Sequence, residues 1–333
     1  MGESVLPFPQ KPALARSAAE LPDADAMPGG TVYEPKFDGY RALLFVHAGE
    51  CRIQSRAGRD VTHAFPEIAA AAVSSLPSGV VIDGEIVLWG DEVDDFVELE
   101  RRLNGTATAT LRERHPASFI AFDLLSGAGM DMRRSPFRVR RHALTMLLGD
   151  EPAPLHLVPQ TPDLEEARSW LVLYADAQVG IEGVVAKGLA TAYEPGGHPW
   201  LKVRTHESTE CVVGAVTGSL RAPSRLILGL LDGDGLLGPV GCTVELTLPQ
   251  SRRMASLLAP ADSSHPWTLP EAILDTPGWT GPPVAGALVA PTHVIEVSML
   301  QGGDAEEWTA PRELLRSRPD LRPDDLQARG MRA

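Results

Sequence analysis

Short apolar runs separated by turn residues are the main pattern of the first two hundred residues. They predict strands that begin near residue 31 and continue over 42–47, 51–56, 80–88, 118–125, 181–187 and 200–204. Gly49 and Glu50 predict a hairpin turn between the second and third of these strands. Helical periodicity predicts helices over 65–75, 95–103, 138–148 and 164–177, the last with Asp163 as its N-cap.

The pattern changes after about residue 205. Shorter β-like runs, separated by Gly, Asp and Pro, lie over 211–216, 226–231 and 239–248, near 288, and over 293–298. Runs of this kind predict a small β-barrel. The chain of 333 residues is also long enough for two domains, and we place their boundary near Arg204 to Glu207.

Composition limits the class of protein. Hydrophobic residues make up 44% of the chain and charged residues 22%, which is typical of a globular protein. No apolar run approaches the 18 or more residues of a membrane helix, and the N-terminus has no secretory signal pattern. We therefore expect a cytoplasmic location. The three cysteines, Cys51, Cys211 and Cys242, are too few and too scattered for a disulfide framework and are predicted core thiols.

The formal net charge of −14 argues against nucleic acid as a partner, because phosphate binding needs positive potential. The arginines are nevertheless clustered, over 133–141 and again over 312–322. Each cluster can be a phosphate-binding surface or a solvated helix face, and the sequence leaves both interpretations open.

Lysine is scarce, and its positions are informative. Only four of the 30 cationic residues are lysine: Lys11, Lys36, Lys187 and Lys202. A lysine can act as an amine nucleophile, whereas a guanidinium stays protonated. The chain has no P-loop or Rossmann glycine pattern, so a covalent lysine is an alternative way to hold a nucleotide.

Carboxylates accompany these lysines. The segment from Lys36 to Arg41 supplies an amine, the carboxylate of Asp38 and a cation, although a surface turn would also explain it. Asp83-Gly84-Glu85 and Glu182-Gly183 place carboxylates inside apolar strands, which is costly unless they meet a cation or a metal ion. Two such carboxylates could also act as the acid and base of a hydrolase.

Taken in order, these segments resemble the nucleotidyltransferase motifs of ATP-dependent DNA ligases, and most closely the two-domain bacterial ligase C type. The resemblance runs from about residue 30 to 322. The matching segments are 36–41 (motif I), 55–58 (Ia), 83–85 (III), 119–123 (IIIa), 182–187 (IV), 200–204 (V) and 311–321 (VI).

The resemblance implies an α+β fold. A nucleotidyltransferase (adenylation) domain of antiparallel sheets flanked by helices would occupy residues 1–205, and a β-barrel OB-fold domain would occupy 206–333. It also implies an enzyme that seals nicks in duplex DNA, in DNA repair, through AMP carried on Lys36. ATP and Mg²⁺ or Mn²⁺ are the implied cofactors. The implied protein is a monomer, associated with the nucleoid, and a primase-polymerase is a candidate partner.

The resemblance further assigns residues. The catalytic residues are Lys36, Asp38, Arg41, Lys187 and Lys202. The nucleotide-binding residues are Glu34, Lys36, Arg41, Arg56, Glu85, Phe122, Lys187, Lys202, Arg204, Arg316 and Arg318, with Phe122 stacking on adenine. Glu85 and Glu182 would hold the metal ion, and Arg41, Lys187 and Lys202 would lower the pKa of the Lys36 amine.

Three positions depart from the family pattern. Arg204 stands where many members have lysine, Thr309 where arginine is common and Leu321 where lysine is common. Other functions remain open on the sequence: an RNA ligase or capping guanylyltransferase, which shares the covalent lysine, or an inactive homologue that only binds nucleic acid. Labelling by ATP and sealing of nicked DNA distinguish these alternatives.

Overall fold

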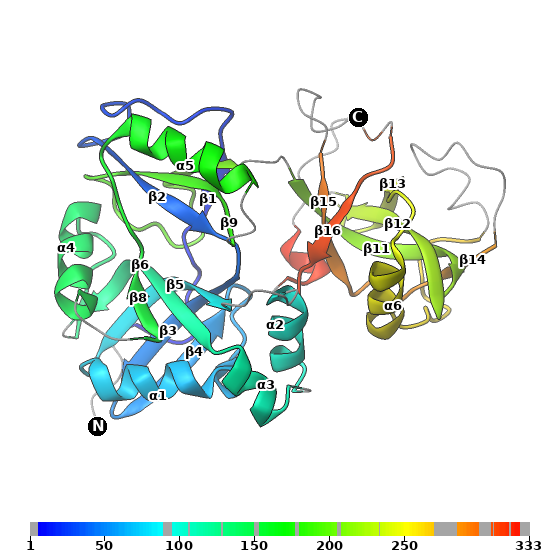
Figure 1. The fold of residues 1–333 in the computed structure, drawn as a ribbon, viewed down its shortest axis with the longest axis horizontal. Helices are drawn as coiled ribbons and strands as arrows, with labels where there is room; N and C mark the ends of the chain where they lie inside the picture. Colours follow the sequence, from blue (N-terminus) through cyan, green and yellow to red (C-terminus); the bar gives the residue numbers. More distant parts are fainter. Residues whose placement is uncertain are drawn as a thin grey trace. The chain divides into compact units, whose positions relative to one another are not determined.

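The computed structural model divides the chain into two compact units, 1–205 and 206–333 (Figure 1). The described residues are 6–88, 95–105, 107–127, 129–149, 153–176, 180–204, 208–232, 234–269, 285–299, 308, 310–319 and 321–326. The expected boundary falls mostly on 205–207, which lie outside the described residues, as does Thr309.

The first unit contains a four-stranded sheet with two chemically different faces. Its order is β1 (Ala15–Ser17), β10 (Trp200–Arg204), β9 (Ile181–Gly188) and β2 (Thr31–Phe37), with β1 parallel to β10 and the other pairs antiparallel. Tyr33, Val184 and Val203 are buried on the face that packs against α5 (Leu164–Asp176). The alternation of side chains along strands places the charged residues on the opposite face, namely Glu34, Lys36, Lys187, Lys202 and Arg204.

The second sheet of this unit lies on the other side of these charged residues. Its order is β4 (Glu50–Ser55), β3 (Tyr40–His47), β5 (Val80–Leu88), β6 (Ala117–Gly127) and β7 (Met130–Asp131), and β8 (Leu155–Leu157) runs parallel to β6. One face buries Leu44 and Ile82 against α1 (Pro66–Ser75) and α4 (Phe137–Leu148). From the other face, Leu43 and Val81 pack with Trp200 of the first sheet. The charged residues therefore lie between two sheets.

The predicted helices of the first unit are confirmed as α1, α2 (Asp95–Leu103), α4 and α5, and Asp163 caps α5 by accepting a hydrogen bond from the backbone N–H of Glu165. The sequence did not predict α3 (Ala109–Arg114), the short η1 (Thr62–Ala64) or the short strands β1, β7 and β8. The hairpin turn lies one residue earlier than predicted, at Ala48 and Gly49, which both have positive φ. That backbone matches the twist of the flanking strands.

The second unit is built on a six-stranded sheet. Its order is β13 (Leu237–Cys242), β12 (Ala222–Leu231), β11 (Ser208–Ser219), β15 (Val294–Ser298) and β16 (Leu314–Ser317), with β14 (Gly286–Leu288) also on β11. A bridge between Thr243 and Arg312 joins the ends of β13 and β16. The short η2 (Pro323–Asp325) follows β16.

The predicted strand over 239–248 is wrong at its end. The strand stops at Cys242, and α6 (Leu248–Leu257) begins six residues later. Thr247 and Gln250 form a reciprocal capping box, and Pro249 occupies the first turn, where its missing N–H is not needed. This local start signal was present in the sequence and outweighs the apolar run. Among the described residues, no helix is long and apolar enough to cross a membrane.

Candidate active site

Lys36 lies at the centre of the charged face. Its amine forms an ion pair with Glu182 of β9, and Arg204 Nη2 of β10 lies 3.7 Å from the same Glu182 oxygen. Lys36, Gly183 and Arg204 are paired across the three strands. A Cβ on Gly183 would lie 2.2 Å from the Val203 carbonyl oxygen, so glycine is what lets β9 approach β10 closely here.

The surroundings of Lys36 lower the pKa of its amine. Burial is the largest cause, and Arg204 is the cation that contributes most, whereas Glu182 and Glu85 raise the pKa. Both predicted metal-binding glutamates therefore act on this amine, as expected. Arg41, Lys187 and Lys202, which were expected to lower this pKa, are not among its largest causes.

Lys187 occupies a closed aromatic environment. Its side chain is 1% exposed, and its amine lies 4.5–4.8 Å from the ring centres of Phe122, Phe137 and Trp200. It donates a hydrogen bond to the Phe122 carbonyl at 2.8 Å and pairs with Glu34 Oε2 at 2.7 Å. Its charge is therefore balanced by Glu34 rather than directed at Lys36.

Glu34 is the buried partner that makes this arrangement possible. Its other oxygen accepts hydrogen bonds from Gln160 Nε2 at 3.2 Å and from Arg141 Nη1 at 3.4 Å. Burial raises the pKa of Glu34 and lowers the pKa of Lys187, and each group counteracts the shift of the other. A pair of this kind is stable only because both charges are matched and hydrogen-bonded.

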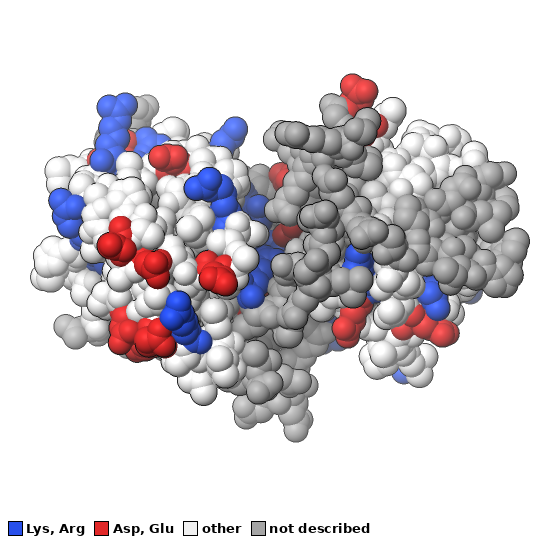
Figure 2. Space-filling model, turned by 90° about the horizontal axis from the view of Figure 1, so that it is seen from above, with Lys and Arg blue, Asp and Glu red and all other residues white. Residues whose placement is uncertain are grey.

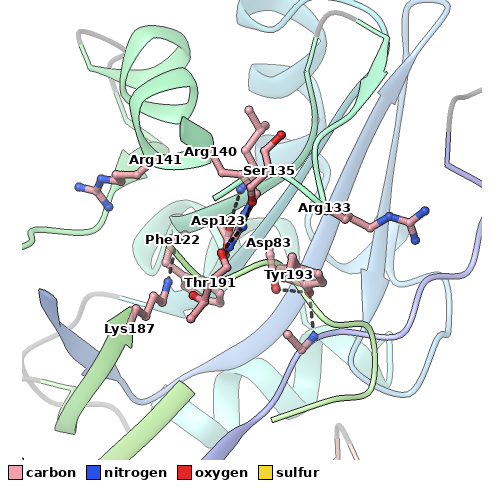
Figure 3. A network of polar contacts seen from close by, with 12 residues as sticks. Asp83, Phe122, Asp123, Arg133, Ser135, Arg140, Arg141, Lys187, Thr191 and Tyr193 are labelled. Atoms are coloured by element: carbon pink, nitrogen blue, oxygen red, sulfur yellow. Dashed lines mark hydrogen bonds and ion pairs between the residues drawn. The ribbon is translucent and has the colours of Figure 1, made fainter. Parts of the chain in front are cut away.

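Arg41 is held in a fixed orientation. Its Nε and Nη2 donate to the two oxygens of the fully buried Asp83, both at 2.6 Å, and Nη2 also donates to the Ala13 carbonyl at 3.1 Å. The guanidinium lies 4.5 Å from the ring centre of Phe122. Tyr193 donates to Asp83 Oδ2 at 2.6 Å (Figure 3).

A second buried carboxylate, Asp123, holds Arg140 (Figure 3). Both side chains are 0% exposed, and two hydrogen bonds of 2.7 and 2.9 Å join them. Arg140 Nη1 donates to the carbonyls of Ser135 and Thr191. Both interpretations offered for the 133–141 cluster, a phosphate-binding surface and a solvated helix face, are therefore wrong for Arg140, which is an internal structural cation.

The other sequence-predicted residues occupy more open positions. Asp38 lies in the turn between β2 and β3, and its backbone N–H donates to the Gly180 carbonyl at 2.8 Å. Arg56 lies in the turn after β4, and Lys202 lies on β10 on the same face as Arg204; both are half-buried.

Arg316 and Arg318 belong to the second unit, where they meet two carboxylates. Glu296 accepts from Arg316 Nε at 2.7 Å and from Arg318 Nη1 at 3.1 Å, and Glu210 accepts from Arg318 Nη1 at 3.0 Å. Arg312, Arg316 and Arg318 are all at least nine-tenths buried. Within the 312–322 cluster, Arg316 and Arg318 therefore belong to an internal ion-pair network.

The carboxylates near Lys36 suit one type of metal site. Among the described residues, no three His, Cys, Asp or Glu side chains come together as a cage for a metal ion. Glu85 and Glu182 offer hard oxygen ligands on neighbouring parts of the site. Two carboxylates without a full cage fit Mg²⁺ or Mn²⁺, since Mg²⁺ is commonly held by one or two carboxylates together with substrate phosphates.

Several residues that build the site were not assigned from the sequence: Asp83, Asp123, Arg140, Tyr193 and Trp200. Asp83 had a signal, since it stands in a quoted motif as a charge within an apolar strand. Asp123 and Trp200 also stand in matching segments, 119–123 and 200–204. Tyr193 had no signal, because its contacts depend on how the two sheets meet.

The comparisons with known proteins agree with this geometry. The family model for the ATP dependent DNA ligase domain matches residues 12–204, which include Lys36, Glu182 and Arg204. The chain belongs to the ATP-dependent DNA ligase family. The predicted family, the predicted dependence on ATP and the predicted enzyme class, DNA ligase, are confirmed.

Relatives of this ligase include DNA ligase C2 of Mycolicibacterium smegmatis, 39% identical over 272 residues that cover 79% of this chain and 74% of the relative. DNA ligase C of Mycobacterium tuberculosis is 35% identical, with 78% and 74% covered. A solved structure of mycobacterial DNA ligase D complexed with ATP and MES has a TM-score of 0.59 at 24% identity, covering 95% of this chain and 97% of that one. That likeness supports the ligase fold.

Proposed function

We propose that this ligase seals nicks in duplex DNA through AMP carried on Lys36. The observation that carries the proposal is the position of the Lys36 amine, between Glu182 and Arg204 and within electrostatic reach of Glu85. A surface lysine would have no such surroundings. The Lys36 side chain as a whole is 22% exposed.

In the first step the neutral Lys36 amine attacks the α-phosphorus of ATP. The N–P bond forms, the P–O bond to pyrophosphate breaks, and the nitrogen that is now bonded to phosphorus loses one proton. Glu182, already paired with this amine, is placed to accept the proton. Transfer of AMP to the 5′-phosphate of the nick then breaks the N–P bond, and attack by the 3′-hydroxyl releases AMP and joins the strand.

Glu85 and Glu182 are the residues that would hold Mg²⁺ or Mn²⁺. A bound divalent ion supplies charge neutralisation at the phosphate oxygens. Arg204 lies beside Glu182 and supplies a fixed positive charge, and Lys202 lies on the same strand face. These cations and carboxylates match a phosphoryl transfer, which depends on positioning and charge more than on a dedicated base.

The nucleotide-binding roles are also proposals. Phe122 would offer its ring to adenine. Lys187, which donates to the Phe122 carbonyl, and its partner Glu34 would form the closed end of that pocket, since both are buried. Arg41 would bind the nucleotide through Nη1, and Arg56 would reach the ribose or phosphate from its turn. Asp38, in the turn that follows Lys36, would complete the catalytic set.

We assign residues 1–205 to an adenylation domain and 206–333 to an OB-fold domain. The bridge from Thr243 to Arg312 supports the second assignment, because it joins the two edges of the sheet as barrel closure requires. Arg316 and Arg318 would orient pyrophosphate. That role requires them to exchange Glu296 and Glu210 for phosphate oxygens.

The proposed partner is nicked duplex DNA. The negative total charge does not prevent this, because phosphate binding depends on where the cations lie, and the face seen in Figure 2 carries cations as well as carboxylates. We further propose a monomer that acts in the cytoplasm at the nucleoid, in DNA repair, with a primase-polymerase as a candidate partner. Affinity for DNA should fall steeply as salt rises.

Two substrates test the proposed function. The protein incubated with α-labelled ATP and a divalent ion should become covalently labelled, and it should seal a nicked duplex with ATP and not with GTP. Labelling by GTP, or sealing restricted to RNA, would point to a capping-type enzyme or an RNA ligase. DNA binding without any label would mean an inactive homologue.

The pH dependence of self-adenylation should report the pKa of Lys36. The rate should rise with pH as the amine loses its proton, and should level off below the ordinary lysine pKa of about 10.4 because burial lowers it. Arg204→Gln removes a cation that lowers this pKa, so its profile should move to higher pH. Single-turnover labelling between pH 6 and 10 measures the shift. A profile that stays in place or moves to lower pH would contradict the role of Arg204 in lowering the pKa of Lys36.

A further inference from the structure

A closed ring of hydrogen bonds joins the N-terminal segment to Arg41. The Ala13 N–H donates to the Tyr193 hydroxyl at 2.9 Å, and that hydroxyl donates to Asp83 Oδ2 at 2.6 Å. Asp83 accepts from Arg41, which donates back to the Ala13 carbonyl at 3.1 Å. The dashed lines of Figure 3 follow this path from Asp83 through Tyr193 to a backbone nitrogen.

The segment around Ala13 is itself anchored on both sides. The Leu14 N–H donates to the Gly197 carbonyl at 2.8 Å, and β1 continues beside β10. Upstream, Gln10 exchanges hydrogen bonds with the buried Gln54 of β4, at 2.7 and 2.6 Å. The Ala13 peptide is thus held in place from both sides.

Tyr193 is suited to act as a permanent donor. Burial and the neighbouring Asp83 raise the pKa of the Tyr193 hydroxyl well above its ordinary value, so it keeps its proton. Its hydrogen bond adds to the two that Asp83 receives from Arg41. With Nε and Nη2 bound in this way, the guanidinium plane cannot rotate, and Nη1 is the nitrogen that remains for a ligand.

We propose that Tyr193, supported by the Ala13 peptide, is a positioning residue that fixes Arg41 for the attack on ATP. Tyr193 does not touch the nucleotide and acts through Asp83 and Arg41. The inference rests on the proposed function, in which Arg41 helps to bind ATP. Misplacement of a binding group by about 1 Å can slow a reaction by about 100-fold, so a lost positioning bond should have a clear kinetic effect.

Tyr193→Phe removes the hydroxyl alone, and Tyr33→Phe is its matched control. Tyr33 is also fully buried in the first unit, and its hydroxyl donates to the Pro22 carbonyl at 2.6 Å, but it lies on the face that packs against α5. Single-turnover self-adenylation at saturating ATP should slow about 10- to 100-fold in Tyr193→Phe. The rate should stay within about twofold of wild type in Tyr33→Phe. Both variants are measured at a temperature at which thermal unfolding shows that all the proteins are folded.

A double-mutant cycle shows whether Tyr193 acts through Arg41. In the Arg41→Lys background, Tyr193→Phe should slow self-adenylation little further, because lysine cannot form the two-bond contact that Tyr193 stabilises. Equal rates for the two Phe variants, or independent and additive losses in the cycle, would overturn the proposal. Absence of label on the wild-type protein would instead overturn the proposed function, before any variant is compared.

Discussion

Lys36→Arg is expected to abolish self-adenylation, with a loss of about four orders of magnitude or more in the rate of covalent labelling by ATP. The guanidinium keeps the positive charge and can still pair with Glu182, so the electrostatics of the site change little. It does not lose its proton in a protein, however, and so cannot supply the lone pair that forms the N–P bond. Gel-based labelling with α-labelled ATP measures the loss.

Two controls separate this effect from a folding defect. Lys11→Arg makes the same change at an exposed lysine in the N-terminal segment and should label like wild type. Nicked DNA that already carries AMP on its 5′-phosphate should still be sealed by Lys36→Arg, because that step needs no lysine nucleophile. Persistent labelling of Lys36→Arg would remove Lys36 from its proposed role.

Arg140→Met is expected to lower the free energy of unfolding by about 3–5 kcal/mol, because it leaves Asp123 as an unmatched buried charge. Both side chains are 0% exposed, so water cannot replace the lost partner. Arg133→Met is the matched control. Arg133 pairs with Asp131 at 2.7 Å, where the two side chains are 25% and 39% exposed, and the expected cost is below about 1 kcal/mol.

Urea unfolding followed by circular dichroism measures both variants. Asp123→Asn added to Arg140→Met should recover part of the lost stability, since the buried charge is then removed. If Arg140→Met lowers the free energy of unfolding no more than Arg133→Met does, Arg140 is not an internal structural cation.

The sequence predicted the strands of the first unit well, because each combines an apolar run with a turn signal at its ends. It also predicted that charged residues inside strands need partners, and Glu182 with Lys36 is such a case. The strand β1 could not be found in this way. It has only three residues and exists because β10 offers a free edge beside it.

The sequence indicates which charges are buried more readily than it indicates the residues that pair with them. Arg140 lies 17 residues from Asp123, and the pairing depends on how α4 packs against β6. Lys187 was expected to lower the pKa of Lys36, but its amine, surrounded by aromatic rings, pairs with Glu34. The start of helix α6 depends on a local signal instead, because its capping box is readable in the sequence.

One of the four lysines, Lys36, is proposed to carry AMP. Peptide mapping by mass spectrometry, after incubation with ATP and a divalent ion and removal of free nucleotide, tests it directly. We expect an adenylate mass on the peptide that contains Lys36 and unmodified peptides for Lys11, Lys187 and Lys202. An adenylate on any other residue, or no adduct on a protein that seals nicks, would contradict it.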